Sequence, residues 1–114
     1  MTSLEMFTKA REHLLAQNCK AVPEGGILHG CAYRGVDNLK CAVGCLIPDD
    51  KYDAAWEGIS VGGLPEDFLG APVTDKQFML LGNLQQIHDE LPVVAWAGAL
   101  NDLGALVARG DYDA

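Results

Sequence analysis

Apolar side chains recur at helical spacing at the start of the chain, which predicts an amphipathic helix over residues 3–18. Thr2 and Glu5 fit a capping box, in which each side chain accepts a hydrogen bond from a backbone amide at the helix start. Asn18 is the expected end of the helix. The side chains predicted to face inward are Leu4, Phe7, Leu14 and Leu15.

The same spacing predicts two more helices in the last third of the chain. Thr74 and Gln77 form a second capping box at the start of the first of them. Pro92 occupies the first turn of the other, which runs to about Arg109 and stops at Gly110. The predicted inward residues are Phe78, Leu81, Leu84, Ile87 and Leu91 in one helix and Val93, Trp96, Leu100, Leu103 and Val107 in the other.

Residues 31–50 carry a different pattern, with three of the four cysteines and a nearly continuous apolar run beside a turn signal. Asp37 and Asn38 tolerate the left-handed conformations of hairpin loops. We therefore predict a β-hairpin of two strands in which Arg34 lies opposite Cys41. A change of turn type by one residue would alter this register, so the pairing of the thiols stays open.

Two less regular segments follow the hairpin. Residues 49–56 place Tyr52 and Trp56 on one face among helix-forming alanines, which predicts a short helix. Residues 59–73 are rich in glycine and proline and predict a connecting loop, long enough for a role in binding. The alternative is a loop anchored to the core by its apolar side chains, namely Leu64, Phe68 and Leu69.

The composition is that of an ordered globular protein, with 49% hydrophobic and 21% charged residues in a chain of 114. A second domain would have too little apolar surface to bury, so we predict a single globular domain over residues 1–114. The expected fold class is α+β, with about four helices packed around a small two-stranded β-hairpin.

The charge of the chain is negative and unevenly distributed. The net charge is −8, with six basic and eight acidic residues in positions 1–60 and two basic and eight acidic residues in positions 61–114. A surface of this kind repels phosphate backbones, which disfavours direct binding of nucleic acid. It attracts a basic partner.

The chain carries no pattern for export or for crossing a membrane. No basic region leads into an apolar one at the start. The most apolar stretch, residues 92–108, is interrupted by Asn101 and Asp102 and is shorter than the roughly 20 residues needed to span a bilayer. We expect a cytosolic protein, in the bacterial cytoplasm, whose cysteines are free thiols.

Soft metal ligands gather around the predicted hairpin. His29 and Cys31 are separated by one residue, and Cys41 and Cys45 would share a face if that run were helical. Together they supply the imidazole and thiolate groups that suit zinc. The alternative, which we favour, is buried thiols, because free cysteine packs as a small hydrophobic side chain. No metal or other cofactor is then expected.

A thiol-based enzyme would need a cysteine beside a base. The histidines other than His29 are His13 and His88, and nothing in their spacing brings either next to Cys41 or Cys45. His88 and Asp89 lie near a helix end, where hydrogen bonds to the helix terminus commonly explain such a pair. We therefore expect a protein that is not an enzyme.

Tyr33, Arg34 and Lys40 form the candidate binding site. On adjacent strands they would make one aromatic and basic patch in a chain that has few basic residues. Such a patch could bind a carboxylate or a phosphate. The alternative is an internal ion pair between Arg34 and Asp49 or its neighbour Asp50.

Two segments of the chain resemble those of a known family. The segments CAYRGVDNLKCAVGCLIPDD and LQQIHDELP, with Trp96 downstream, resemble a family of small proteins of unassigned function from phages, prophages and bacteria. The resemblance covers most of the chain. Members commonly have Asp-Gly or Asn-Gly at the turn, where this chain has Asp37 and Asn38.

This resemblance and the acidic charge together suggest the function. We expect a non-enzymatic interaction protein of phage or mobile-element origin that binds a bacterial host protein, such as a basic nucleic-acid-handling or defence protein. The alternative is a small-ligand or zinc-binding module that uses the Cys/His and Tyr-Arg cluster. A homodimer is a further option, since Ala97, Ala105 and Ala108 leave the last helix smooth.

Overall fold

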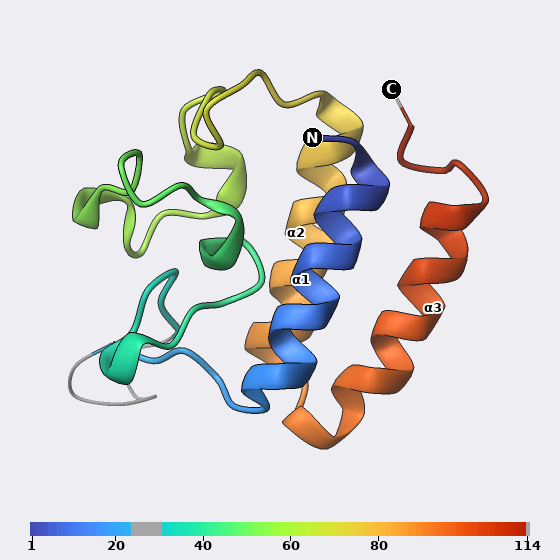
Figure 1. Ribbon diagram of the computed structural model, residues 1–114, viewed down its shortest axis with the longest axis horizontal. Helices are drawn as coiled ribbons and strands as arrows, with labels where there is room; N and C mark the ends of the chain where they lie inside the picture. Colours follow the sequence, from blue (N-terminus) through green and yellow to red (C-terminus); the bar gives the residue numbers. More distant parts are fainter. Residues whose placement is uncertain (24–30, 114) are drawn as a thin grey trace.

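The computed structural model describes residues 1–23 and 31–113. Within this part of the chain it has three α-helices, α1 (Ser3–Gln17), α2 (Asp75–Glu90) and α3 (Trp96–Ala108), and several single turns of 3-10 helix. Figure 1 shows the three helices side by side, with residues 31–73 forming an irregular layer beside them. Near the two ends of the described chain, the Ser3 hydroxyl donates to the Tyr112 carbonyl. Each helix contacts both of the others.

The start and end of α1 are as predicted. The Thr2 hydroxyl accepts a hydrogen bond from the amide of Glu5, the Glu5 carboxylate accepts one from the amide of Thr2, and Asn18 ends the helix in a left-handed conformation. The predicted inward face is partly wrong, because Leu4 and Leu15 are exposed. They lie about 100° around the helix from the stripe that α2 and α3 cover. The buried residues of α1 are Ser3, Met6, Phe7, Ala10 and Leu14.

Helix α2 also begins at its predicted capping box, formed by Thr74 and Gln77. Its buried residues include Leu81, Leu84 and Ile87, as expected from the periodicity. His88 is buried too.

The helix predicted from Pro92 to about Arg109 forms as two parts. A 3-10 turn, Val93–Ala95, precedes α3, and Gly110 follows with φ 91°, a conformation that favours glycine. The predicted inward residues of α3 are buried, namely Trp96, Leu100, Leu103 and Val107. The three alanines Ala97, Ala105 and Ala108 are exposed, and self-association through them stays a prediction.

The predicted α+β fold is wrong, because the described residues contain no β-strand and the fold is all-α. The turn at Asp37 and Asn38 does form, with both residues at positive φ. It closes a single antiparallel bridge that pairs Arg34 with Lys40, one residue away from the predicted register.

The hairpin stops there because its backbone amides have other partners. The amides of Tyr33 and Arg34 donate to the Glu57 carboxylate, and the amide of Lys40 donates to the Gln17 side chain. In the observed register the amides of Arg34 and Lys40 point away from the partner strand, and the next ladder bond would run from the Tyr33 amide to the Cys41 carbonyl. That bond is not made, because the Tyr33 amide donates to Glu57 and the Cys41 carbonyl accepts from the Cys45 amide. Side chains therefore replace the β-sheet that the sequence predicts.

The segment after this turn is irregular as well. The predicted helix at residues 49–56 is reduced to one 3-10 turn, Ala54–Trp56, capped by the Asp53 carboxylate. The loop at 59–73 is anchored by apolar side chains that are buried in the core: Val61, Leu64 and Phe68. Ile59, Ser60 and Gly62, at the start of this loop, are exposed and face α2.

Candidate functional site

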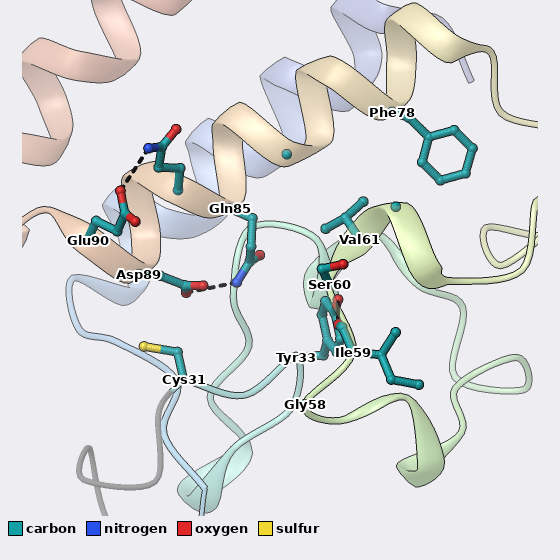
Figure 2. Close-up of a pocket in the computed structure, with 13 residues that line it drawn as sticks. Cys31, Tyr33, Gly58, Ile59, Ser60, Val61, Phe78, Gln85, Asp89 and Glu90 are labelled. Atoms are coloured by element: carbon teal, nitrogen blue, oxygen red, sulfur yellow. Dashed lines mark hydrogen bonds between the residues drawn. The ribbon is translucent and has the colours of Figure 1, made fainter.

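An open cleft of about 550 Å³ runs between α2 and the segment at 58–62. Figure 2 shows α2 along one wall, the segment along the other and Tyr33 between them. The lining residues are Cys31, Tyr33, Gly58, Ile59, Ser60, Val61, Gly62, Phe78, Gly82, Gln85, Gln86, Asp89 and Glu90.

The two ends of the cleft differ in chemistry. Phe78, Ile59 and Val61 give one end an apolar surface, whereas Asp89 and Glu90 place two carboxylates at the other (Figure 2). No lysine or arginine belongs to this described lining. The cleft is thus able to hold a ligand that is apolar at one end and cationic at the other.

Two glutamines hold the carboxylates in place. Gln85 Nε2 donates to Asp89 Oδ1 and Gln86 Nε2 donates to Glu90 Oε2, each at 2.8 Å and each across one turn of α2. Both hydrogen bonds are drawn in Figure 2. Each hydrogen bond favours one position of its carboxylate at the acidic end.

Cys31, His88 and Asp89 converge at this acidic end. One potential ligand atom from each lies within 4.8 Å of the others. His88 Nδ1 is 2.6 Å from Asp89 Oδ1, and its Nε2 accepts a hydrogen bond from the amide of Ala21 at 3.0 Å. The imidazole is thus neutral with its hydrogen on Nδ1, where it donates to the carboxylate.

This tautomer limits what His88 can do. Its one lone pair is used by the Ala21 amide, so it is not placed to take a proton from Cys31. A metal at Nδ1 would have to displace the hydrogen that Asp89 accepts. The ring is also fully buried and stacked on Trp96 at 5.5 Å between centroids. His88 therefore serves to connect α2 with the chain after α1.

The Cys31 thiol is not activated. Burial, followed by the charge of Asp89 and a hydrogen bond to it, raises the pKa of this thiol, while Lys20 lowers it by less. A protonated thiol is a poor nucleophile at neutral pH. The group is suited to packing or hydrogen bonding in the cleft.

The three predicted binding residues lie close together but make internal contacts. Tyr33 is buried and its hydroxyl donates to the Ile59 carbonyl. Arg34 donates to the Ile47 carbonyl at 2.8 Å and pairs with Asp49 at 2.9 Å, and its guanidinium lies over the Tyr52 ring. These contacts match the internal ion pair that was the alternative for this patch.

Lys40 completes the cluster, since its Nζ is 3.9 Å from the same Asp49 carboxylate. Glu57 joins the other side, accepting from the Tyr33 and Arg34 amides and from the Tyr52 hydroxyl. Of the three predicted residues, Tyr33 also lines the cleft. A binding role for Tyr33, Arg34 and Lys40 stays a prediction.

The predicted zinc ligands are not brought together as a set in the described residues. Cys41 is buried and accepts from the Gly44 amide, while the Cys45 thiol donates to the Ala42 carbonyl. Burial raises the pKa of each of these two thiols to about 12. Cys31 lies instead with His88 and Asp89, and His29 lies outside the described residues.

The sequence contained partial signals for this site. The pair His88 and Asp89 and the length of the loop at 59–73 both drew attention, but nothing linked them to Cys31 or to Glu90. An indication was available at the end of α2, where two acidic residues stand at the negative end of the helix dipole. That placement opposes helix stability and is typical of residues kept for another purpose.

Comparisons with models of protein families, with curated proteins and with solved structures give no match for this chain. The family resemblance therefore stays a prediction. None of the described helices combines the length and the apolar character that crossing a membrane requires.

Proposed function

We propose that this chain is a non-enzymatic interaction protein that binds a basic segment of another protein through the cleft along α2. The observation that carries the proposal is the acidic end of the cleft, where Asp89 and Glu90 are held in place by two glutamines. These hydrogen bonds reduce the side-chain freedom that the carboxylates lose when they bind a cation.

The distribution of the basic residues supports this proposal. Arg34 and Lys40 contact Asp49, and Arg109 pairs with Asp111. Lys20 lies beside the acidic end and donates to the Asp89 carbonyl at 3.1 Å, so it offsets part of the charge there. Two carboxylates against one ammonium leave this end negative.

The chemistry of the thiol supports binding over catalysis. Cys31 has a raised pKa, and the lone pair of His88 is already used. A nucleophile without a nearby base is not equipped for group transfer. The cleft is better suited to recognition.

The proposed partner is a basic bacterial protein, and the proposed setting is the bacterial cytoplasm. The net charge of −8 supports a basic partner, and the resemblance to phage and bacterial proteins supports the bacterial setting. The same charge disfavours nucleic acid as the direct ligand, whereas a protein that handles nucleic acid presents the basic surface required.

The test is capture from bacterial lysate by the immobilised chain, compared with two charge-matched variants. One combines Asp89→Asn with Glu90→Gln, and the control combines Glu12→Gln with Asp102→Asn on exposed positions of α1 and α3. Each variant changes the net charge from −8 to −6. We expect a basic protein to bind the native chain and the control, to be released by salt, and to be lost from the cleft variant.

Equal capture by both variants would contradict the proposal, and so would a captured protein that is acidic or insensitive to salt. Asn at position 89 keeps a carbonyl oxygen for His88 and Gln85, so loss of binding would not reflect a broken helix end. Circular dichroism of the variants checks this point.

The alternative function is a small-ligand or zinc-binding module, and the convergence of Cys31, His88 and Asp89 is the observation that favours it. Metal analysis of the purified chain tests it. About one zinc per chain, lost in Cys31→Ser and kept in Cys45→Ser, would support this alternative. Absence of bound zinc would oppose it.

A further inference from the structure

We infer that the cleft binds an extended segment of the partner in which a large apolar side chain and a lysine or arginine are four residues apart. This inference rests on the proposed function and adds the conformation and the sequence pattern of the ligand. It follows from the length of the cleft, from the open space beside Gly82 in its α2 wall and from the charge at the end of α2.

The length of the cleft sets the length of the ligand. Its α2 wall extends from Phe78 to Glu90, which is about 18 Å at the usual helical rise. An extended chain covers that distance with roughly five or six residues. Side chains four positions apart on such a chain point the same way and are about 13 Å apart.

A hollow in the α2 wall provides the site for the apolar side chain. Gly82 lines the cleft, and a Cβ added there would meet no atom within 4 Å. Phe78 lies one turn away on the same helix, and Ile59 is 41% exposed on the opposite wall. We place the leucine-sized side chain of the ligand over Gly82, between Phe78 and the apolar residues Ile59 and Val61 of the opposite wall.

The cation would lie about 12 Å from this hollow. Gly82 and Glu90 are eight residues apart on α2, which places the carboxylates at nearly the spacing of the second side chain. These carboxylates also stand at the C-terminal end of α2, where the helix dipole adds negative potential. A lysine or arginine there receives both attractions.

Labelled peptides of seven residues test the pattern by fluorescence anisotropy. The matching peptide is Gly-Leu-Ser-Gly-Ser-Lys-Gly, and two controls replace its Lys by Glu or exchange its Leu with the central Gly to give Gly-Gly-Ser-Leu-Ser-Lys-Gly. We expect the matching peptide to bind about tenfold more tightly than either control. Equal binding of the three, or displacement by free lysine amide as effective as by the matching peptide, would overturn the inference.

A blocking variant tests the place of binding. Gly82→Leu should fill the hollow without strain, while Gly98→Leu adds the same side chain to α3, where a Cβ also meets no atom within 4 Å. We expect Gly82→Leu to weaken binding of the matching peptide about tenfold or more and Gly98→Leu to leave it unchanged. The same effect in both variants would overturn the inference.

The two proposals fail separately. If Gly82→Leu still captures the basic partner while the Asp89→Asn and Glu90→Gln double variant does not, the extended-segment inference is wrong and the proposed function stands. If both variants still capture it, the proposed function is wrong. Thermal unfolding confirms in each case that the variant is folded.

Discussion

The three-helix bundle and the irregular layer of residues 31–73 are stabilised in different ways. In the bundle, most backbone groups are paired inside the helices, and the ends of α1 and α2 are closed by their own capping boxes. In the irregular layer, side chains from distant positions satisfy the backbone, as Glu57 does for Tyr33 and Arg34. The layer therefore depends on a few polar residues that each serve several partners.

Titratable groups whose pKa is raised mainly by burial lie in the irregular layer. Burial raises the pKa of Cys41 and Cys45 to about 12 and that of Tyr52 also to about 12, and it raises the pKa of Tyr33 further. All four lie in the irregular layer. Burial in this layer therefore disfavours the charged forms of these thiols and phenols.

The largest expected effect is at Gly44, where the irregular layer has no room for a side chain. A Cβ at this position would lie 1.8 Å from the Tyr33 carbonyl oxygen, so the backbone would have to move. We expect Gly44→Ala to lower the free energy of unfolding by about 3 kcal/mol or more, measured by urea denaturation. Gly62→Ala is the matched control, since a Cβ there meets no atom within 4 Å.

Glu57→Ala should have the next largest effect. It removes the acceptor for the Tyr33 and Arg34 amides and the Tyr52 hydroxyl, and we expect a loss of about 2 to 3 kcal/mol. Hydrogen exchange should become faster at residues 31–36 and stay slow in the middle of α1 and α3. Equal acceleration in the helices would show that the two regions unfold as one unit.

Alkaline pH should weaken the irregular layer. The native pKa values of Cys41 and Cys45 are raised from 9.0 to about 12, so stability is unaffected below pH 9 and falls as the unfolded thiols ionise above it. We expect a loss of about 1 kcal/mol per thiol at pH 10. Denaturant midpoints measured from pH 7 to 10 check this, and Cys45→Ala should show a smaller fall than the native chain.

The bundle should respond least to the loss of one polar group. Thr74→Ala removes the hydroxyl that accepts from the Gln77 amide at the start of α2, and we expect a cost of about 1 kcal/mol. Thermal unfolding measures it. Thr74→Ser, which keeps the hydroxyl, should stay near the native value. A cost as large as that of Glu57→Ala would remove the distinction between the two regions.

The candidate site was harder to predict than the helices around it. The sequence drew attention to the Tyr33 and Arg34 patch, which the structure uses for contacts with Ile47 and Asp49. Asp89 was noted as a neighbour of His88, but its proximity to Cys31 depends on contacts between residues far apart in the chain. No local spacing encodes such a contact.

The helices could be read from the chain because their determinants are local. The capping boxes at Thr2 and Thr74, the stop at Asn18 and the apolar spacing all act within a few residues of one another. The predicted hairpin ended after one bridge although its turn formed, because Glu57 takes the Tyr33 amide that the next ladder bond would need. Only the packing of the whole chain decides which of several distant partners a backbone donor finds, since burial obliges every donor to find one. The same packing brings α2 and the segment at 58–62 together to form the cleft.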